Sequence, residues 1–185
     1  MTNPRRTQPR ILVIEDDAAF GPMLRGGLLE LSTDVALVEC VDDAVEALMK
    51  APYDLVVVDI WLPKTCSALR EKRELEVAYD ALTEELIQFD DDESRKAILR
   101  EKMEQNIAEA RTKLERRGGL MILESLADIE SSVGAILFLT AIGNSETRQE
   151  TTNLASRIGC KFVYLVKPQT PEAIHANAKA LLSQE

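Results

Sequence analysis

Four short apolar runs, rich in β-branched residues, constrain the fold of this chain more than any other feature. Because each run is apolar throughout, a strand made from it is expected to be buried on both faces. Stretches with helical periodicity separate the runs, and this alternation is typical of a doubly wound α/β fold around a parallel sheet. The runs are Ile11–Ile14, Leu55–Val58, Ala135–Leu139 and Phe162–Val166, and Val35–Val38 is a weaker fifth strand.

Five amphipathic stretches are predicted to form the helices of this fold. Asp42 and Asp43 are suited to cap the start of one helix, and Pro171 is suited to the first turn of the last helix. Right-handed crossovers place the functional loops at the carboxyl ends of the strands. The predicted helices are Ala18–Glu30, Asp42–Lys50, Leu120–Ser131, Ser145–Arg157 and Pro171–Ser183.

Composition argues against several classes of function. The formal net charge of −10 disfavours a nucleic-acid-binding surface, and no apolar run approaches the roughly 18 residues that a membrane span needs. Residues 1–9 carry charge without an apolar stretch long enough for a signal peptide, so they are predicted to be a disordered tail. The three cysteines are too scattered for a disulfide framework; they are expected to be ordinary small apolar residues, in a cytoplasmic protein.

Residues 64–117 differ in composition from the rest and are predicted to be an insert into a domain made of residues 10–63 and 118–185. Charged residues fill 26 of the 54 positions in the insert, against 28 of the other 131. Two apolar seams recur in it at helical spacings, the first as a heptad pattern, which predicts an antiparallel, coiled-coil-like helical hairpin. The seams are Leu75, Tyr79, Leu82, Leu86 and Phe89, then Leu99, Met103, Ile107, Ala110 and Leu114.

Charged side chains follow three of the predicted strands at their carboxyl ends. Glu15 and Asp16 follow the first strand, Asp59 ends the third, and Lys167 follows the last. Each has a structural explanation when taken singly, since acids cap helices and Lys-Pro forms turns. Together, the three carboxylates would crowd at one edge of the sheet, which is costly unless a cation offsets their repulsion. Mg²⁺ and a lysine suit such a site, which predicts phosphoryl transfer to an aspartate nucleophile.

The segments that bear these residues resemble the receiver domain of two-component response regulators. The matching segments are ILVIEDD, VVVDIWLP, FLTA and YLVKP, in that order along the chain. Each motif is weak alone, but four in order with suitable separations are specific, and they span the chain outside the tail and the insert. The resemblance implies a flavodoxin-like fold, with a five-stranded parallel sheet of order 2-1-3-4-5.

The resemblance also implies a role for each residue at the predicted site. Asp59 would be the phosphoacceptor, and Asp16 would be a direct ligand of Mg²⁺, with Mn²⁺ as the alternative metal. Glu15 would hold a metal-bound water, and Trp61 would coordinate the metal through its backbone carbonyl. Lys167 would pair with the phosphate.

Three further residues would connect phosphorylation to a response. Thr140 would hydrogen-bond a phosphate oxygen, the Ala141 N–H would add another contact, and Tyr164 would be the coupled aromatic switch. The phosphoryl group would come from a histidine kinase or a phosphotransfer protein, and the signal would pass to a downstream protein rather than to nucleic acid or a membrane. The acyl phosphate is labile, so the phosphoryl group would be lost by hydrolysis without another protein. The protein would not be a turnover enzyme.

The role of the hairpin remains open among several alternatives. The hairpin would emerge beside Asp59. It would be an inert decoration, a gate that controls access to Asp59, a docking arm for a partner, or a dimerising element. The last helices are an alternative site of dimerisation. The alternative function for the whole chain is a pseudo-receiver scaffold that acts through the hairpin without phosphorylation. A phosphohydrolase of the haloacid dehalogenase type is disfavoured, because Trp61 stands where those enzymes carry a second acid.

Overall fold

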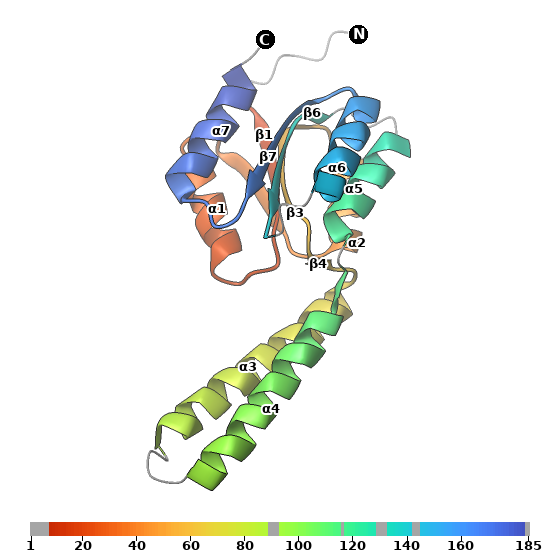
Figure 1. Ribbon diagram of the computed structural model, residues 1–185. Coiled ribbons are helices and arrows are strands. Elements are labelled where there is room, and N and C mark those ends of the chain that lie inside the picture. The colour runs from red at the N-terminus through yellow and green to blue at the C-terminus, as the bar shows by residue number, and fades with distance from the viewer. Residues whose placement is uncertain (1–7, 89–92, 116, 129–132, 142–144, 184–185) are drawn as a thin grey trace.

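The computed structural model describes residues 8–88, 93–115, 117–128, 133–141 and 145–183, and a five-stranded parallel sheet forms its centre (Figure 1). Its strand order, β2-β1-β3-β6-β7, confirms the predicted doubly wound, flavodoxin-like fold. Every predicted strand is present and is extended by one or two residues at one end or both. The strands are β1 (Arg10–Ile14), β2 (Asp34–Val38), β3 (Tyr53–Asp59), β6 (Val133–Thr140) and β7 (Lys161–Val166).

Helices cover both faces of the sheet (Figure 1). Successive residues of a strand point to opposite faces, so Ile11 and Val13 pack towards one helical layer and Leu12 and Ile14 towards the other. All four side chains are fully buried, which explains the unbroken apolar run. The first layer contains α1 (Phe20–Leu28) and α7 (Pro171–Ser183), and the second contains α2 (Val41–Lys50), α5 (Gly118–Asp128) and α6 (Ser145–Ile158).

The predicted helical hairpin is present and projects away from the sheet (Figure 1). Its two helices pack against each other, and the described seam positions are partly or fully buried, except that Ile107 is 37% exposed. Phe89 of the predicted seam lies outside the described residues. Two short antiparallel strands that the sequence did not predict close the base of the hairpin. These elements are β4 (Leu62–Pro63), α3 (Cys66–Gln88), α4 (Glu93–Thr112) and β5 (Leu114–Glu115).

The first helix starts later than predicted because the side chain of Asp17 binds the backbone ahead of it. The carboxylate of Asp17 accepts the backbone N–H groups of Ala19 and Phe20 at 2.9 and 2.8 Å. α1 therefore begins at Phe20 and not at Ala18. These bonds also lower the pKa of Asp17, with the Phe20 N–H as the largest cause.

The second helix also starts differently from the prediction. Its N-cap residue is Cys40, so Asp42 and Asp43 lie in the first turn and do not cap it. Acidic residues there are still favourable, because they face the positive end of the helix dipole. Residues 1–7 of the predicted tail lie outside the described part of the chain. Within the described ranges, no helix is long and apolar enough to cross a membrane.

Candidate functional site

The register of the sheet brings the ends of β1 and β3 together. Ile14 lies opposite Val58, so Glu15 and Asp16, which follow β1, lie beside Asp59 at the end of β3. The four paired residues of each strand are apolar and buried, and the polar residues begin directly after them. The sheet therefore gathers the three predicted acids at its carboxyl edge.

Glu15, Asp16 and Asp59 form an acid cluster whose carboxylate oxygens lie within 4.8 Å of one another. The three residues are only 2%, 5% and 8% exposed, respectively. Buried carboxylates at this separation repel one another strongly, so the cluster needs protons or cations. This is the concentration of negative charge that the sequence predicted.

Lys167 supplies one of these cations. Its Nζ lies 2.8 Å from Glu15 Oε2 and 2.9 Å from Asp59 Oδ2, so a single ammonium group bridges two members of the acid cluster. Its backbone N–H donates to the carbonyl of Thr140 at 2.6 Å, and the ring of Phe20 lies 4.9 Å from Nζ. The bond from Lys167 to Pro168 is cis. The structure thus places the predicted lysine against the predicted phosphoacceptor.

Burial and mutual repulsion perturb the ionisation of the cluster. Burial is the largest cause that raises the pKa of Glu15 to about 7, and the charge of Asp59 adds to it, while Lys167 opposes both. Burial likewise raises the pKa of Asp16. For Lys167, burial acts to lower the pKa, but the charges of Asp59 and Glu15 outweigh it and the net shift is upward. Asp16, the third acid of the cluster, forms an ion pair with a different cation.

That cation is Lys72 of the hairpin, which the sequence analysis missed. Its Nζ lies 2.8 Å from Asp16 Oδ2 and 2.8 Å from Glu76 Oε1, and the residue is 9% exposed. The sequence carried a signal, because Lys72 precedes Leu75 and Tyr79 at the spacing of the apolar seam. A lysine on the buried face of a helix is uncommon without an acidic partner.

The remaining predicted residues lie around the same edge of the sheet. Thr140, the last residue of β6, is fully buried, and Ala141 after it is exposed. Trp61 is partly buried two residues after β3. The ring of Tyr164 stacks on Phe138, with centroids 5.9 Å apart and planes at 15°. Thr140, Ala141 and Trp61 thus lie at or just after the ends of strands at this edge of the sheet. Tyr164 lies within β7.

The acid cluster fits a hard divalent cation. Its donors are three carboxylates, the ligand type that Mg²⁺ and Mn²⁺ prefer. Asp16 Oδ2 is buried, and the Lys72 ammonium group 2.8 Å away balances its charge. Three buried carboxylates that share two lysines still carry negative charge that a divalent cation would offset.

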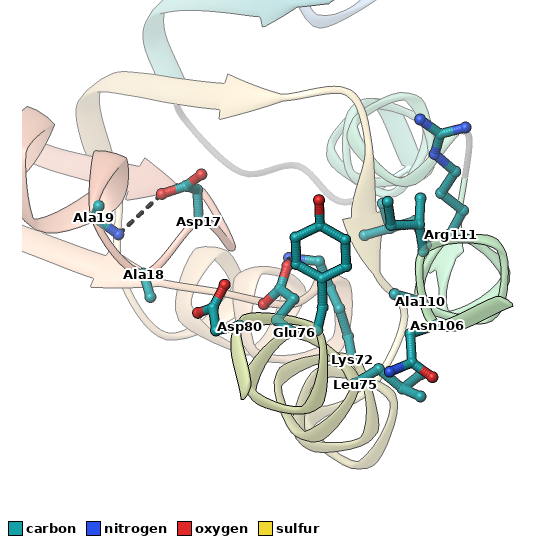
Figure 2. Close-up of a pocket in the computed structure, with 13 residues that line it drawn as sticks. Asp17, Ala18, Ala19, Lys72, Leu75, Glu76, Asp80, Asn106, Ala110 and Arg111 are labelled. Atoms are coloured by element: carbon teal, nitrogen blue, oxygen red, sulfur yellow. Dashed lines mark hydrogen bonds and ion pairs between the residues drawn. The ribbon is translucent and has the colours of Figure 1, made fainter. Parts of the chain in front are cut away.

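A cavity of about 590 Å³ lies between the loop after β1 and the hairpin (Figure 2). It adjoins the acid cluster, since Lys72 lines it and contacts Asp16. Acidic and basic groups both face it, so the cavity is not a simple apolar cleft. Asp17, Ala18 and Ala19 line one side, α3 contributes Lys72, Glu76 and Asp80, and α4 contributes Asn106, Ala110 and Arg111.

Comparison with solved structures identifies the fold. A signal receiver domain from Vibrio parahaemolyticus superposes with a TM-score of 0.57 and 15% identity, over 95% of this chain and 90% of that one. A response regulator from Colwellia psychrerythraea superposes with a TM-score of 0.54 and 10% identity, over 97% of this chain and 100% of that one. A CheY-like receiver domain from Methylobacillus flagellatus superposes with a TM-score of 0.52 and 16% identity, over 95% of this chain and 99% of that one.

These likenesses show that the chain has the receiver-domain fold, as the motifs implied. They do not extend to the sequence, because no family model matches the chain and no curated protein does either. The chemistry of the site therefore has to be argued from its own residues.

Proposed function

We propose that this protein is a phosphorylation-dependent signalling switch in which Asp59 accepts a phosphoryl group from a histidine kinase or a phosphotransfer protein. One observation carries the proposal. Lys167 Nζ bridges Asp59 Oδ2 and Glu15 Oε2 within a buried acid cluster at the carboxyl edge of a receiver-type sheet. A core that served packing alone would not gather three buried carboxylates, because each is costly to remove from water.

Asp59 is the nucleophile of the proposed transfer. Its Oδ1 accepts the Ile60 N–H at 2.7 Å, which fixes the plane of the carboxylate. A carboxylate oxygen attacks phosphorus, a new P–O bond forms, and the bond from phosphorus to the donor breaks. Lys167, which already lies 2.9 Å from Asp59 Oδ2, then pairs with the phosphoryl oxygens.

Glu15, Asp16, Asp59 and the backbone carbonyl of Trp61 would hold Mg²⁺, or alternatively Mn²⁺. The metal, when bound, would neutralise charge on the transferred group. The protein's own contribution is to hold the three carboxylates close together, which the loop after β1 and the end of β3 achieve.

Thr140, Ala141 and Tyr164 would transmit the change. The Thr140 hydroxyl and the Ala141 N–H would hydrogen-bond the phosphoryl oxygens. Tyr164, whose ring contacts Phe138 and lies 6.0 Å from the Arg148 guanidinium, would then repack against α6. The resulting surface, or the hairpin, would bind a downstream protein or a second copy of this chain.

Modification of Asp59 tests this function directly. The purified protein is incubated with Mg²⁺ and acetyl phosphate, and its mass is followed alongside Asp59→Asn and Asp54→Asn. Asp54 lies near the start of the same strand and is exposed, so it is a matched control. We expect one added phosphoryl group in the wild type and in Asp54→Asn, decaying without another protein, and none in Asp59→Asn.

The fluorescence of Trp61 gives a second readout, because it is the only tryptophan in the sequence. Beryllium fluoride added after Mg²⁺ should change it in the wild type and not in Asp59→Asn. Unmodified wild-type protein, together with a silent Trp61, would instead favour the pseudo-receiver scaffold that acts through the hairpin.

A further inference from the structure

The hairpin supplies a cation to the acid cluster. Lys72 lies in the second turn of α3, and its ammonium group contacts both Asp16 and Glu76 at 2.8 Å. Lysine side chains are almost never buried without a partner. Asp16 is the partner across the fold, and Glu76, one turn further along α3, is the partner within the helix.

Lys72 and the proposed metal compete for the same oxygen atoms. Asp16 Oδ2, which Lys72 contacts, belongs to the carboxylate that the proposed function gives to the metal. Three ionised acids carry three negative charges, and Lys167 with Lys72 leaves one of these uncompensated. Exchange of Lys72 for a divalent cation would leave none, whereas both together would leave one excess positive charge beside the metal, offset only in part by the half-exposed Glu76.

The structure also provides a place for the displaced lysine. Lys72 and Glu76 both line the 590 Å³ cavity between α3 and the loop after β1 (Figure 2). Glu76 is 48% exposed and already contacts Lys72, so the ammonium group can leave Asp16 and keep an acidic partner. Displacement therefore requires a change of side-chain rotamer and no unfolding.

We propose that Lys72 is an internal competitor of the metal, so that metal loading detaches the base of the hairpin from the acid cluster. The coupling is reciprocal: the Lys72–Asp16 ion pair weakens metal binding by the same factor by which the metal weakens the ion pair. This inference rests on the metal site of the proposed function. It assigns the insert a defined task, which is to sense the occupancy of that site.

Mg²⁺ affinity tests the competition. Calorimetric titrations compare the wild type with Lys72→Met, which keeps most of the length of the side chain and removes its charge. Arg70→Met is the matched control, because it removes one positive charge from an exposed position of the same helix. We expect Lys72→Met to bind Mg²⁺ about 5- to 150-fold more tightly, the range of typical coupling factors, and Arg70→Met to bind as the wild type does.

Hydrogen exchange in α3 supplies a readout independent of affinity. Mg²⁺ should accelerate amide exchange around Lys72 in the wild type and leave it unchanged in Lys72→Met, where the ion pair with Asp16 is already absent. Equal Mg²⁺ affinity in the two proteins would overturn the competition but leave the metal site intact. Absence of Mg²⁺ binding in both would overturn the metal site and the competition together.

Glu76→Gln is a second variant with the opposite expectation. Glu76 is half exposed, so its replacement should not impair folding. Lys72 then keeps only Asp16 as its acidic partner, and Mg²⁺ should bind more weakly than in the wild type. Tighter binding in Glu76→Gln would contradict the competition.

A second inference rests on a different contact. Cys40 Sγ and Cys66 Sγ lie 3.5 Å apart, although the two residues are 26 positions apart in sequence. Cys40 is fully buried before α2, whereas Cys66 is exposed at the first residue of α3 and donates its S–H to Asp43 Oδ2 at 3.2 Å. The pair joins the main domain to the base of the hairpin.

We infer that Cys40 and Cys66 form a reversible disulfide when a peroxide is present. Cys66, the accessible thiol, attacks the peroxide: an S–O bond forms, the O–O bond breaks and water leaves. Cys40 then attacks the Cys66 sulfur, the S–S bond forms and a second water leaves, so two thiols and one peroxide give one disulfide and two waters. Burial raises the pKa of Cys40 to about 12, so Cys40 is a poor nucleophile towards the peroxide, and its attack on Cys66 depends on the 3.5 Å contact between the two sulfurs.

Peptide mapping after hydrogen peroxide treatment tests this inference. The expected product is a linked peptide pair containing Cys40 and Cys66, which dithiothreitol reverses, while Cys160 remains free for alkylation. Cys66→Ser should abolish the link and Cys160→Ser should preserve it. Sulfinic acid at Cys66 with a reduced Cys40, or a link through Cys160, would overturn the inference.

Discussion

The metal-free protein should lose stability as the pH rises from about 4.5 to about 7, because of Glu15. Burial, with the charge of Asp59, raises the pKa of Glu15 from 4.5 to about 7. The folded protein therefore holds this proton more tightly than the unfolded chain does. The stabilisation is complete below pH 4.5, falls as the pH rises, and is lost once the pH exceeds the folded-state pKa.

The size of this effect follows from the shift. A rise from 4.5 to about 7 corresponds to about 3 kcal/mol, at about 1.36 kcal/mol for each pKa unit. That is a substantial part of the 5–15 kcal/mol or so that stabilises a typical domain. Glu15→Gln removes the titrating group and keeps an oxygen that can accept from Lys167, so its stability should lack this contribution.

Urea unfolding in the presence of EDTA, followed by circular dichroism from pH 4.5 to 8, measures the effect. The free energy of unfolding of the wild type, minus that of Glu15→Gln, should fall by up to about 3 kcal/mol across this range. Glu46→Gln, at an exposed position of α2, is the control for the loss of one acidic side chain. A flat or rising difference for Glu15→Gln would refute the reasoning, and added Mg²⁺ should reduce the slope because it favours the ionised acid.

Three further substitutions, two of them with a comparison variant, test the packing of the site and of the hairpin. Lys167→Met should cost about 3–5 kcal/mol at pH 8, measured by urea unfolding, because the two buried carboxylates that it bridges lose their shared cation. Gly119→Ala should cost at least about 1–3 kcal/mol in thermal unfolding, since its Cβ would lie 2.4 Å from the carbonyl oxygen at the end of β3. Gly26→Ala should instead stabilise α1 by about 0.5–1 kcal/mol, because a Cβ there would meet nothing within 4 Å. Leu99→Ala, at a residue 3% exposed, should destabilise the hairpin by about 2–5 kcal/mol, and Ile98→Ala, 55% exposed, by under about 0.5 kcal/mol in the same assay.

The sequence predicted the sheet because its strands are buried on both faces. β1 and β3 consist almost wholly of apolar residues, which places both at the centre of a parallel sheet. Once Ile14 lies opposite Val58, the acids that follow β1 have to meet Asp59. The acid cluster was therefore predictable from the order of residues alone.

Contacts between the insert and the main domain were not predictable in the same way. Lys72 reaches Asp16, and Cys66 reaches Cys40, only because β4 and β5 set the direction in which the hairpin leaves the sheet. Each of those strands has two residues, too few for a period-two pattern to appear in the sequence. The cysteines were expected to be ordinary apolar residues, and nothing in their spacing indicated that two of them touch.

The charge of the acid cluster predicts an order of events at the hairpin. On the proposed chemistry, metal loading neutralises the three acids together with Lys167 and makes Lys72 superfluous at Asp16. Phosphorylation then replaces the single charge of Asp59 by about −1.5 to −2, which restores a negative excess. Lys72 would be drawn back towards the site, so the hairpin should loosen on addition of Mg²⁺ and tighten again on addition of beryllium fluoride. A hairpin without a functional role would show neither change, because the packing between α3 and α4 does not depend on the charge of the acid cluster.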